Sequence, residues 1–219
     1  ALLPVLLNGY GAPTPIQGFI NEDHVRQKSF AILGEVYIDL SEDTMATVGI
    51  RYNDDTVKDS VASCLTFFSC PNYPLSQKQS GEYGFHPTQV VETDDAIGYK
   101  LAIQHNLADN QMVYASYTTA TKAGGNNPNS TGTPDPYDQE ETGVFEIGTK
   151  SILLDGAMLF NAAYFQNTTN GMLISSIVNA GSRNVNTDAE INGFEGNLLF
   201  FLNETTSIDM TWLKVESEI

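Results

Sequence analysis

The sequence between residues 141 and 170, ETGVFEIGTKSILLDGAMLFNAAYFQNTTN, constrains the fold more than any other part of this 219-residue chain. Apolar and polar residues alternate with a period of two on both sides of Leu154, Asp155 and Gly156. In the first half Phe145, Ile147 and Thr149 share one face, and Glu146, Gly148 and Lys150 share the other. Successive side chains of a β-strand point to opposite faces, so this pattern predicts two long strands joined by a very short turn.

The same hairpin pattern recurs along the chain. Short turns are predicted at residues 41–43, 108–110 and 203–205, and long polar segments separate the hairpins at 53–94, 121–140 and 179–189. The first clear strand is expected at 29–40, whereas 11–27 has the composition of a polar excursion. A soluble β-sandwich shows the same alternation, but usually in shorter strands. About ten strands with long segments at only one end are typical of an outer-membrane β-barrel.

The spacing of aromatic residues supports a membrane barrel. Six aromatic residues on the apolar face lie about eight or nine positions from the nearest short turn: Tyr52, Tyr99, Tyr117, Phe145, Tyr164 and Phe194. Nine residues that rise ~3.3 Å each and tilt by ~45° climb roughly 21 Å, close to the ~25 Å apolar band of a membrane barrel. These rings are therefore expected at the membrane interface. A soluble sandwich has no reason to place them at one height.

Four segments, in this order, resemble the barrel of TonB-dependent outer-membrane receptors. They are GEVYIDLSEDTMATVGIRYNDD (34–55), YASYTTATKAGGNNP (114–128), EIGTKSILLDG with FNAAYF inside 141–170, and INGFEGNLLFFLNETTSIDMTWLKV (191–215). The resemblance covers most of 29–216, although the family usually has a phenylalanine where this chain has Thr121. It implies an all-β, antiparallel transmembrane barrel in the lipid of the bacterial outer membrane, with long extracellular loops and short periplasmic turns.

The resemblance also bears on domain organisation. We treat 1–219 as one partial barrel domain, clearest over 28–219. The family's plug domain and terminal aromatic strand are not recognised in this sequence. The chain is therefore expected to be part of a larger receptor, because an open sheet leaves two unpaired edges that lipid does not tolerate.

The resemblance implies uptake of a scarce nutrient complex by active transport, coupled to TonB through a plug domain. Ferric siderophores are the commonest cargo of such receptors, and haem, cobalamin and carbohydrate are alternatives. A passive porin or a surface-binding barrel without energy coupling is a second hypothesis, and a soluble β-sandwich lectin is a third. No enzyme and no cofactor is expected, because the sequence contains no phosphate loop, zinc signature or nucleophile elbow. The net charge of −17 argues against nucleic acid as a partner.

Two sets of residues are candidates for contact with the nutrient. The first is the charged residues predicted to face the lumen: Glu35, Arg51, Lys100, Glu146, Lys150 and Glu195. The second is aromatic and amide residues of the long segments: Tyr73, Tyr83, Phe85, Asn126, Asn127 and Tyr137. For the first set we expect an ion-pair network, with contact to the nutrient as the alternative. For the aromatic residues of 53–94, packing of the segment on itself is the alternative to ligand contact. Mixed charges, aromatic rings and amides favour a neutral or cationic ligand with many hydrogen-bonding groups.

Cys64 and Cys70 are the only cysteines of the chain. A metal site is not expected, because two thiols without a nearby Cys or His pair fall short of four ligands. A disulfide that closes a small loop suits an oxidising compartment. We therefore predict a Cys64–Cys70 disulfide.

Overall fold

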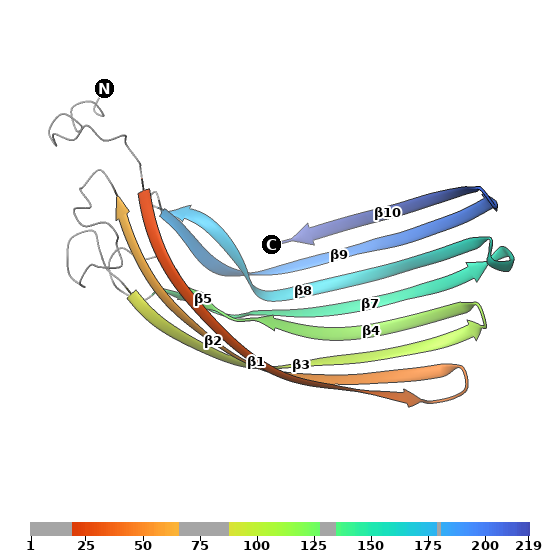
Figure 1. The fold of residues 1–219 in the computed structure, drawn as a ribbon, viewed down its shortest axis with the longest axis horizontal. Helices are drawn as coiled ribbons and strands as arrows, with labels where there is room; N and C mark the ends of the chain where they lie inside the picture. Colours follow the sequence, from red (N-terminus) through yellow and green to blue (C-terminus); the bar gives the residue numbers. More distant parts are fainter. Residues whose placement is uncertain (1–18, 66–87, 128–134, 179–180) are drawn as a thin grey trace, which may run out of the picture.

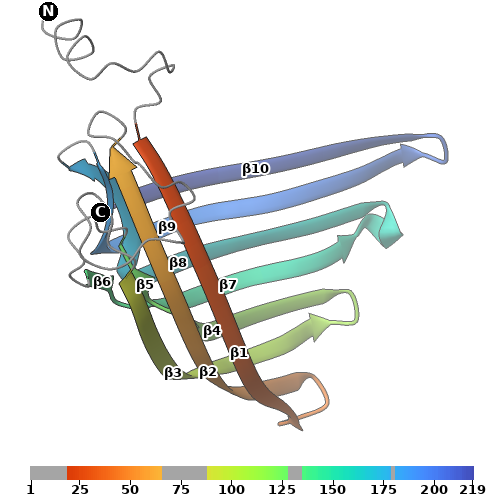
Figure 2. The same ribbon diagram turned by 60° about the vertical axis from the view of Figure 1, so that its left-hand side comes forward.

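The computed structural model describes residues 19–65, 88–127, 135–178 and 181–219. Eight strands form one antiparallel sheet in which every strand pairs with its neighbour in the sheet order β1-β2-β3-β4-β7-β8-β9-β10. Their bounds are β1 (Phe19–Asp39), β2 (Thr44–Leu65), β3 (Thr88–Ala108), β4 (Gln111–Lys122), β7 (Glu140–Leu153), β8 (Met158–Val178), β9 (Gly181–Asn203) and β10 (Thr206–Glu218). Two short strands, β5 (Gly125–Asn126) and β6 (Pro136–Tyr137), form a separate pair. The large sheet curls into an open trough, which confirms the predicted partial β-barrel (Figures 1 and 2).

The short connections lie together at one end of the sheet, which we call the turn end (Figure 1). The turn of the central hairpin is the 3-10 segment η3 (Leu154–Gly156), in which all three residues have positive φ. Neighbouring turns are joined by backbone hydrogen bonds: Asn106 N–H donates to Asp43 O, Ile152 N–H to Asn110 O, and Phe201 N–H to Ala157 O, each at 2.8 Å. The predicted placement of the four short turns at one end is therefore confirmed. In the part of the chain that the structure describes, no helix is long and apolar enough to cross a membrane.

At the opposite end, the outer end, several strands are longer than the sequence predicts. β1 begins at Phe19, inside the segment expected to be a polar excursion, and it pairs with β2 up to Phe19↔Leu65. Residues 53–65 and 88–94, expected to belong to a loop, are strand in β2 and β3. Likewise β8 and β9 stay paired to Val178↔Gly181, so the predicted loop at 179–189 is wrong. Backbone pairing extends these strands beyond the apolar band, where most residues are polar and the alternation of apolar with polar residues is weaker.

The outward face of the sheet carries a band of exposed apolar side chains. Along β3 this face reads Asp95, Ile97, Tyr99, Leu101, Ile103 and His105. Ile97 is 63% exposed and Leu101 is 50% exposed. Ten residues at ~3.3 Å rise and ~45° tilt span roughly 23 Å between the flanking polar residues, which matches the apolar band of a membrane barrel. Among the described residues Ala189 is the one buried hydrophobic residue, so the band has no protein layer to cover it.

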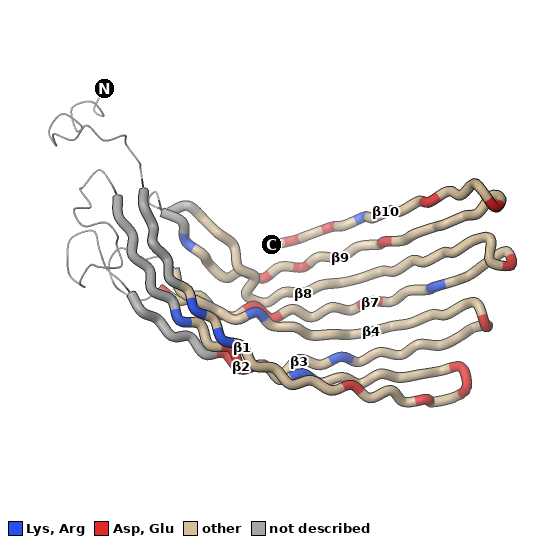
Figure 3. The backbone as a smooth tube through the Cα atoms, viewed as in Figure 1, with Lys and Arg blue, Asp and Glu red and all other residues tan. Residues whose placement is uncertain are grey.

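The aromatic residues expected at the membrane interface lie next to one another on this face. The rings of Tyr99 and Tyr117 are 5.9 Å apart, and those of Tyr164 and Phe194 are 4.9 Å apart. Tyr117 is also the direct cross-strand partner of Phe145. Figure 3 shows acidic residues at the turns and charges of both signs where the strands leave the band. The rings therefore form neighbouring pairs on the outward face, and on β3 the apolar band continues beyond Tyr99 to Ile97. Their position at the membrane interface stays a prediction.

Candidate binding surface on the concave face

The second face of the sheet carries the six charged residues that the sequence predicts to face the lumen. Residue parity places all of them opposite the apolar band, and direct pairs such as Gly49↔Lys100 and Ala163↔Glu195 keep one face across the strands. We call this face the concave face. It faces into the trough, because the segment between β4 and β7 contacts β2 and β3 on one side and β9 on the other. A short segment reaches strands on both sides of a curved sheet only across its hollow side.

Glu35 and Lys100 meet across Gly49. Lys100 Nζ donates to Glu35 Oε1 at 2.8 Å, and the Tyr37 hydroxyl donates to Glu35 Oε2 at 2.6 Å. Gly49 is paired with both Glu35 and Lys100, and a Cβ there would lie 3.0 Å from Glu35 Cγ. The glycine therefore leaves the space in which the two long side chains meet.

A second group of contacts lies on β4 and β7, nearer the turn end. The Tyr114 hydroxyl donates to Glu146 Oε1, and Lys150 Nζ lies 5.7 Å from the centre of the Tyr114 ring. Glu195, on β9, borders a hollow of about 480 Å³ together with Lys150 and other residues. The predicted charges thus share one face, but they form separate local contacts rather than one network.

The segment between β4 and β7, which we call the rim loop, consists of residues 123–139, of which 128–134 are outside the described part. It folds over the concave face near the outer end, where β3 and β4 have separated. The last pair between these two strands on that side is Lys100↔Thr118. Gly124 N–H donates to the carboxylate of Asp94 on β3 at 2.8 Å. Asp94 follows the same alternation as Lys100, so the rim loop lies on the concave side.

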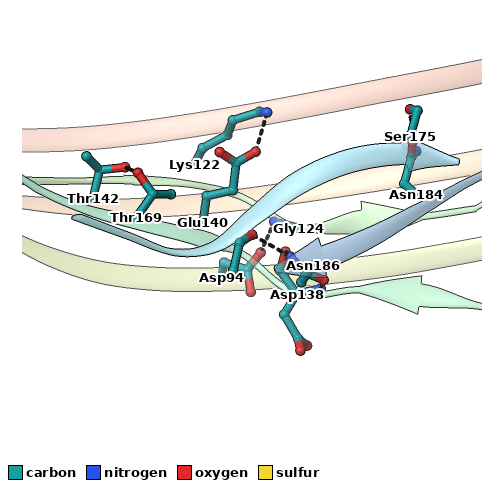
Figure 4. Close-up of polar contacts among 11 residues, drawn as sticks. Asp94, Lys122, Gly124, Asp138, Glu140, Thr142, Thr169, Ser175, Asn184 and Asn186 are labelled. Carbon is teal, nitrogen blue, oxygen red and sulfur yellow. Dashed lines mark hydrogen bonds and ion pairs between the residues drawn. The ribbon is translucent and has the colours of Figure 1, made fainter. Parts of the chain in front are cut away.

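The other end of the rim loop is bound to the β8–β9 hairpin (Figure 4). Asp138 N–H donates to Asn186 Oδ1 at 2.8 Å, and Asn186 Nδ2 donates to both Asp138 O and Gly171 O. Gly171 has φ +68° and lies at a bulge in β8, where its N–H donates to Asp188. This left-handed conformation suits glycine. The amide of Asn186 therefore joins the bulge of one hairpin to the rim loop.

Asp135 and Arg183 add an ion pair to the same connection. Arg183 Nε and Nη2 donate to the two oxygens of Asp135, each at 2.9 Å. The hydrogen bonds and the charge of Asp135 raise the pKa of the Arg183 guanidinium. A second pair, Lys122 with Glu140 at 2.6 Å, joins the two ends of the strands that the rim loop connects.

The structure places the predicted amide residues inside the rim loop. Asn127 is 2% exposed, and its side chain bonds the backbone of Asn184 twice: Nδ2 donates to Asn184 O at 2.9 Å, and Oδ1 accepts from Asn184 N–H at 2.6 Å. Asn126 is 6% exposed and accepts a hydrogen bond from Asp135 N–H. Both amides are occupied within the protein, so a ligand reaches neither without opening the rim loop. Tyr137 lies against Gly125, its partner in the β5–β6 pair.

The remaining predicted residues fall outside the part that the structure describes. Tyr73, Tyr83 and Phe85 lie within 66–87, and their contact with a ligand stays a prediction. The same holds for the Cys64–Cys70 disulfide, because Cys70 is in that segment. Within the described ranges, no three His, Cys, Asp or Glu residues are arranged to hold a metal ion.

Sequence reasoning missed the residues of β9 that hold the rim loop. Arg183, Asn184 and Asn186 were expected in a loop at 179–189. The signal that marks them is the alternation of Asn184, Asn186 and Asp188 with Val185 and Thr187. This period of two indicates a strand with one amide-rich face.

Comparison with known proteins connects this geometry to a family. The model of the TonB-dependent receptor-like β-barrel matches residues 5–215. Comparison with curated protein sequences gave no match. The fold resembles that of the ferric yersiniabactin uptake receptor FyuA from Yersinia pestis, with a TM-score of 0.74 and 17% identity over 92% of this chain and 28% of that one.

Two further solved structures have the same fold. The alcaligin outer-membrane receptor FauA from Bordetella pertussis has a TM-score of 0.62 and 16% identity, over 90% of this chain and 31% of its own. The siderophore receptor PiuA from Acinetobacter baumannii has a TM-score of 0.62 and 19% identity, over 92% and 26%. The chain thus spans less than a third of each of these structures. The family match over nearly the whole chain shows that it belongs to the β-barrel family of TonB-dependent receptors, proteins of the bacterial outer membrane.

Proposed function

We propose that this chain forms part of the wall of an outer-membrane receptor that takes up a scarce nutrient complex by TonB-coupled transport. The observation that carries the proposal is the pairing of an apolar outward band with a polar concave face in a chain whose family is that of transport receptors. The band supplies the surface that contacts lipid, and the concave face supplies the polar wall of a lumen. The coupling requires a plug domain that contacts TonB, and we propose such a plug in the complete receptor.

We propose a ferric siderophore as the cargo, ahead of carbohydrate. FyuA is named for ferric yersiniabactin, and FauA is named for alcaligin. The concave face carries Glu35, Glu146, Glu195 and Asp209 beside Arg51, Lys100 and Lys150, so it does not favour one sign of charge. Together with the net charge of −17, this favours a complex that is neutral or cationic overall. A strongly anionic complex would require clustered arginine and lysine.

A bacterial strain that carries the complete receptor gene tests the proposal. Uptake of radiolabelled iron from siderophore complexes under iron limitation should depend on this gene and should cease when TonB is deleted. Growth on glycans as the sole carbon source is measured in parallel. Gene-dependent growth on a glycan with no response to iron would reverse the order of cargoes.

A passive porin or surface-binding barrel remains the second candidate function. The observation that favours it is the hollow of about 480 Å³ that opens on the concave face between Tyr114, Lys150 and Glu195. Uptake that persists without TonB would support it and contradict coupled transport. The same strain with and without TonB thus separates the two functions.

A further inference from the structure

A second hollow lies on the concave face, beside the point where β3 and β4 separate. Its volume is about 220 Å³, and its floor includes Gly49 and Gly98. Above the pair Lys100↔Thr118 the two strands no longer form a ladder, and Tyr99 N–H donates to the hydroxyl of Thr119 at 3.0 Å instead. The rim loop is bound to Asp94, which precedes Tyr99 by five residues on β3 and lies nearer the outer end. The hollow therefore lies on the inner wall directly below the rim loop.

Two rows of paired residues cross this hollow, and they differ in their charge balance. In the row Glu35–Gly49–Lys100, the cation meets a carboxylate across a glycine, with an ion pair of 2.8 Å. In the next row, Leu33–Arg51–Gly98, the cation has an apolar residue on one side and a glycine on the other. The second row thus contains a cation and no carboxylate.

The surroundings of Arg51 hold the side chain in place and keep space around it. The following row is Ala31–Asn53–Ala96, and Asn53 Oδ1 accepts from Arg51 Nε at 2.6 Å. Ala31, Ala96 and Gly98 have small side chains or none. Arg51 is exposed, and it makes no ion pair with any other described residue. The bond at Nε orients the guanidinium, and among the described residues no acceptor is recorded for its two terminal nitrogens.

We infer that Arg51 binds a carboxylate group of the transported ligand in this hollow. The two terminal nitrogens of a guanidinium match the two oxygens of a carboxylate, an arrangement that lysine does not reproduce. The neighbouring Glu35 repels a ligand with several negative charges, so the hollow selects one acidic group on a complex that is otherwise neutral or cationic. This inference rests on the proposed function, since it assigns one chemical group to the cargo of that receptor.

Chemical labelling of the purified complete receptor tests the inference. Phenylglyoxal modifies accessible arginines, and mass spectrometry reports the modification of Arg51. The probes are two matched pairs: a ferric siderophore complex with one free carboxylate and its methyl ester, and an oligosaccharide ending in a uronic acid and its methyl ester. At least one acid should protect Arg51, and its ester should not. The acid should also bind about tenfold more weakly to Arg51→Gln, as expected for loss of a hydrogen-bonded charge pair.

Control variants separate binding from folding. Arg51→Lys keeps the charge but not the paired donors, so it should restore only part of the lost affinity. Arg26→Gln is the matched control, because Arg26 is an exposed arginine of the same hairpin in the outward register. It should bind acid and ester as the unchanged receptor does. All three variants are compared for heat-modifiable migration, which reports a folded barrel.

Two outcomes would overturn the inference without contradicting the proposed function, and a third would contradict the proposed cargo instead. If no acid protects Arg51 from modification while the receptor still supports TonB-dependent growth on iron, the carboxylate site is rejected and the proposed function is not. The inference is also rejected if Arg51 does not react with phenylglyoxal before any ligand is added, because an acidic side chain elsewhere in the receptor is already paired with it. Protection by the uronic acid but by neither ferric complex would support the site and reject iron as the cargo.

Discussion

The half of the sheet near the turn end and the outer rim are held together by different interactions. Near the turn end every strand between the two edges has a backbone ladder on both sides, and the outward apolar side chains are exposed in the part of the chain that the structure describes. At the outer rim the ladders between β3 and β4 and between β7 and β8 have ended. There the connection across the gap consists of side-chain bonds from Asp94, Asn127, Asp135 and Asn186.

The difference means that the two regions should respond separately to substitution. A ladder distributes its stability over many backbone bonds that do not depend on side-chain identity. The rim depends on a few named side chains, and removal of Asn127 leaves two polar backbone groups of Asn184 without their partner. Damage near the turn end should affect assembly of the barrel, whereas damage at the rim should affect local opening only.

A charge in the apolar band should have the largest effect. Phe160 stacks on Trp212 on the outward face, with ring centres 6.0 Å apart. Phe160→Arg should reduce assembly of the complete receptor, because an arginine facing lipid near the midplane costs about 2–4 kcal/mol. Asn161→Arg is the control, since the adjacent residue faces the concave side. Folding into vesicles, followed by heat-modifiable migration, measures both, and equal yields would contradict the lipid-facing assignment.

The next effect tests packing inside the band. A Cβ on Gly196 would overlap the ring of Trp212, which lies over it. Gly196→Ala should lower the free energy of unfolding by about 1–3 kcal/mol, because the ring and its stack with Phe160 must shift. Gly34→Ala is the matched control, because a Cβ at Gly34 meets nothing within 4 Å. Denaturant unfolding in vesicles compares the two, and the same midpoint for both variants would show that the ring moves at no cost.

At the rim, removal of one amide should loosen the rim loop and leave the barrel folded. Asn127→Ala leaves the N–H and C=O of Asn184 without their partner, a cost of about 1–3 kcal/mol to the closed rim loop. Hydrogen exchange at 123–127 and 183–187 should become faster, while exchange in the band should not change. Lys122→Gln is the control at the same end, because its ion pair is exposed. Slower assembly of the Asn127 variant would show that rim and band are coupled.

The smallest effect is expected for the exposed ion pair of the rim. Arg183→Gln removes the two bonds to Asp135, and solvent already weakens that pair. Exchange at the rim loop should rise less than for Asn127→Ala. In the unchanged protein, raising the salt concentration should reproduce most of this effect, because mobile ions screen exposed charges. A salt response equally large in the Arg183 variant would point to other charges.

Much of the candidate surface was predictable because it depends only on strand parity. Glu35 and Lys100 belong to one face by alternation alone, and the structure shows that they pair. The pairing of Arg51 with Leu33 and Gly98, in contrast, depends on register between three strands. Alternation determines on which face of the sheet a side chain lies, whereas the register between strands determines which residue it lies beside. The unbalanced charge at Arg51 was therefore invisible in the sequence.

The sequence by itself determined the β-class, the four short turns, the apolar band and the face of each charged residue, because a period of two and local turn residues are properties of neighbouring positions. Only the tertiary structure decided the length of the strands above the band, the separation of β3 from β4 and the burial of Asn126 and Asn127. Those features depend on backbone pairing and on contacts between segments as distant as Asn127 and Asn184. A polar segment with water on both sides has the same sequence pattern whether it forms a strand or a loop. Only pairing with another strand, or a hydrogen bond to a side-chain amide, distinguishes the two.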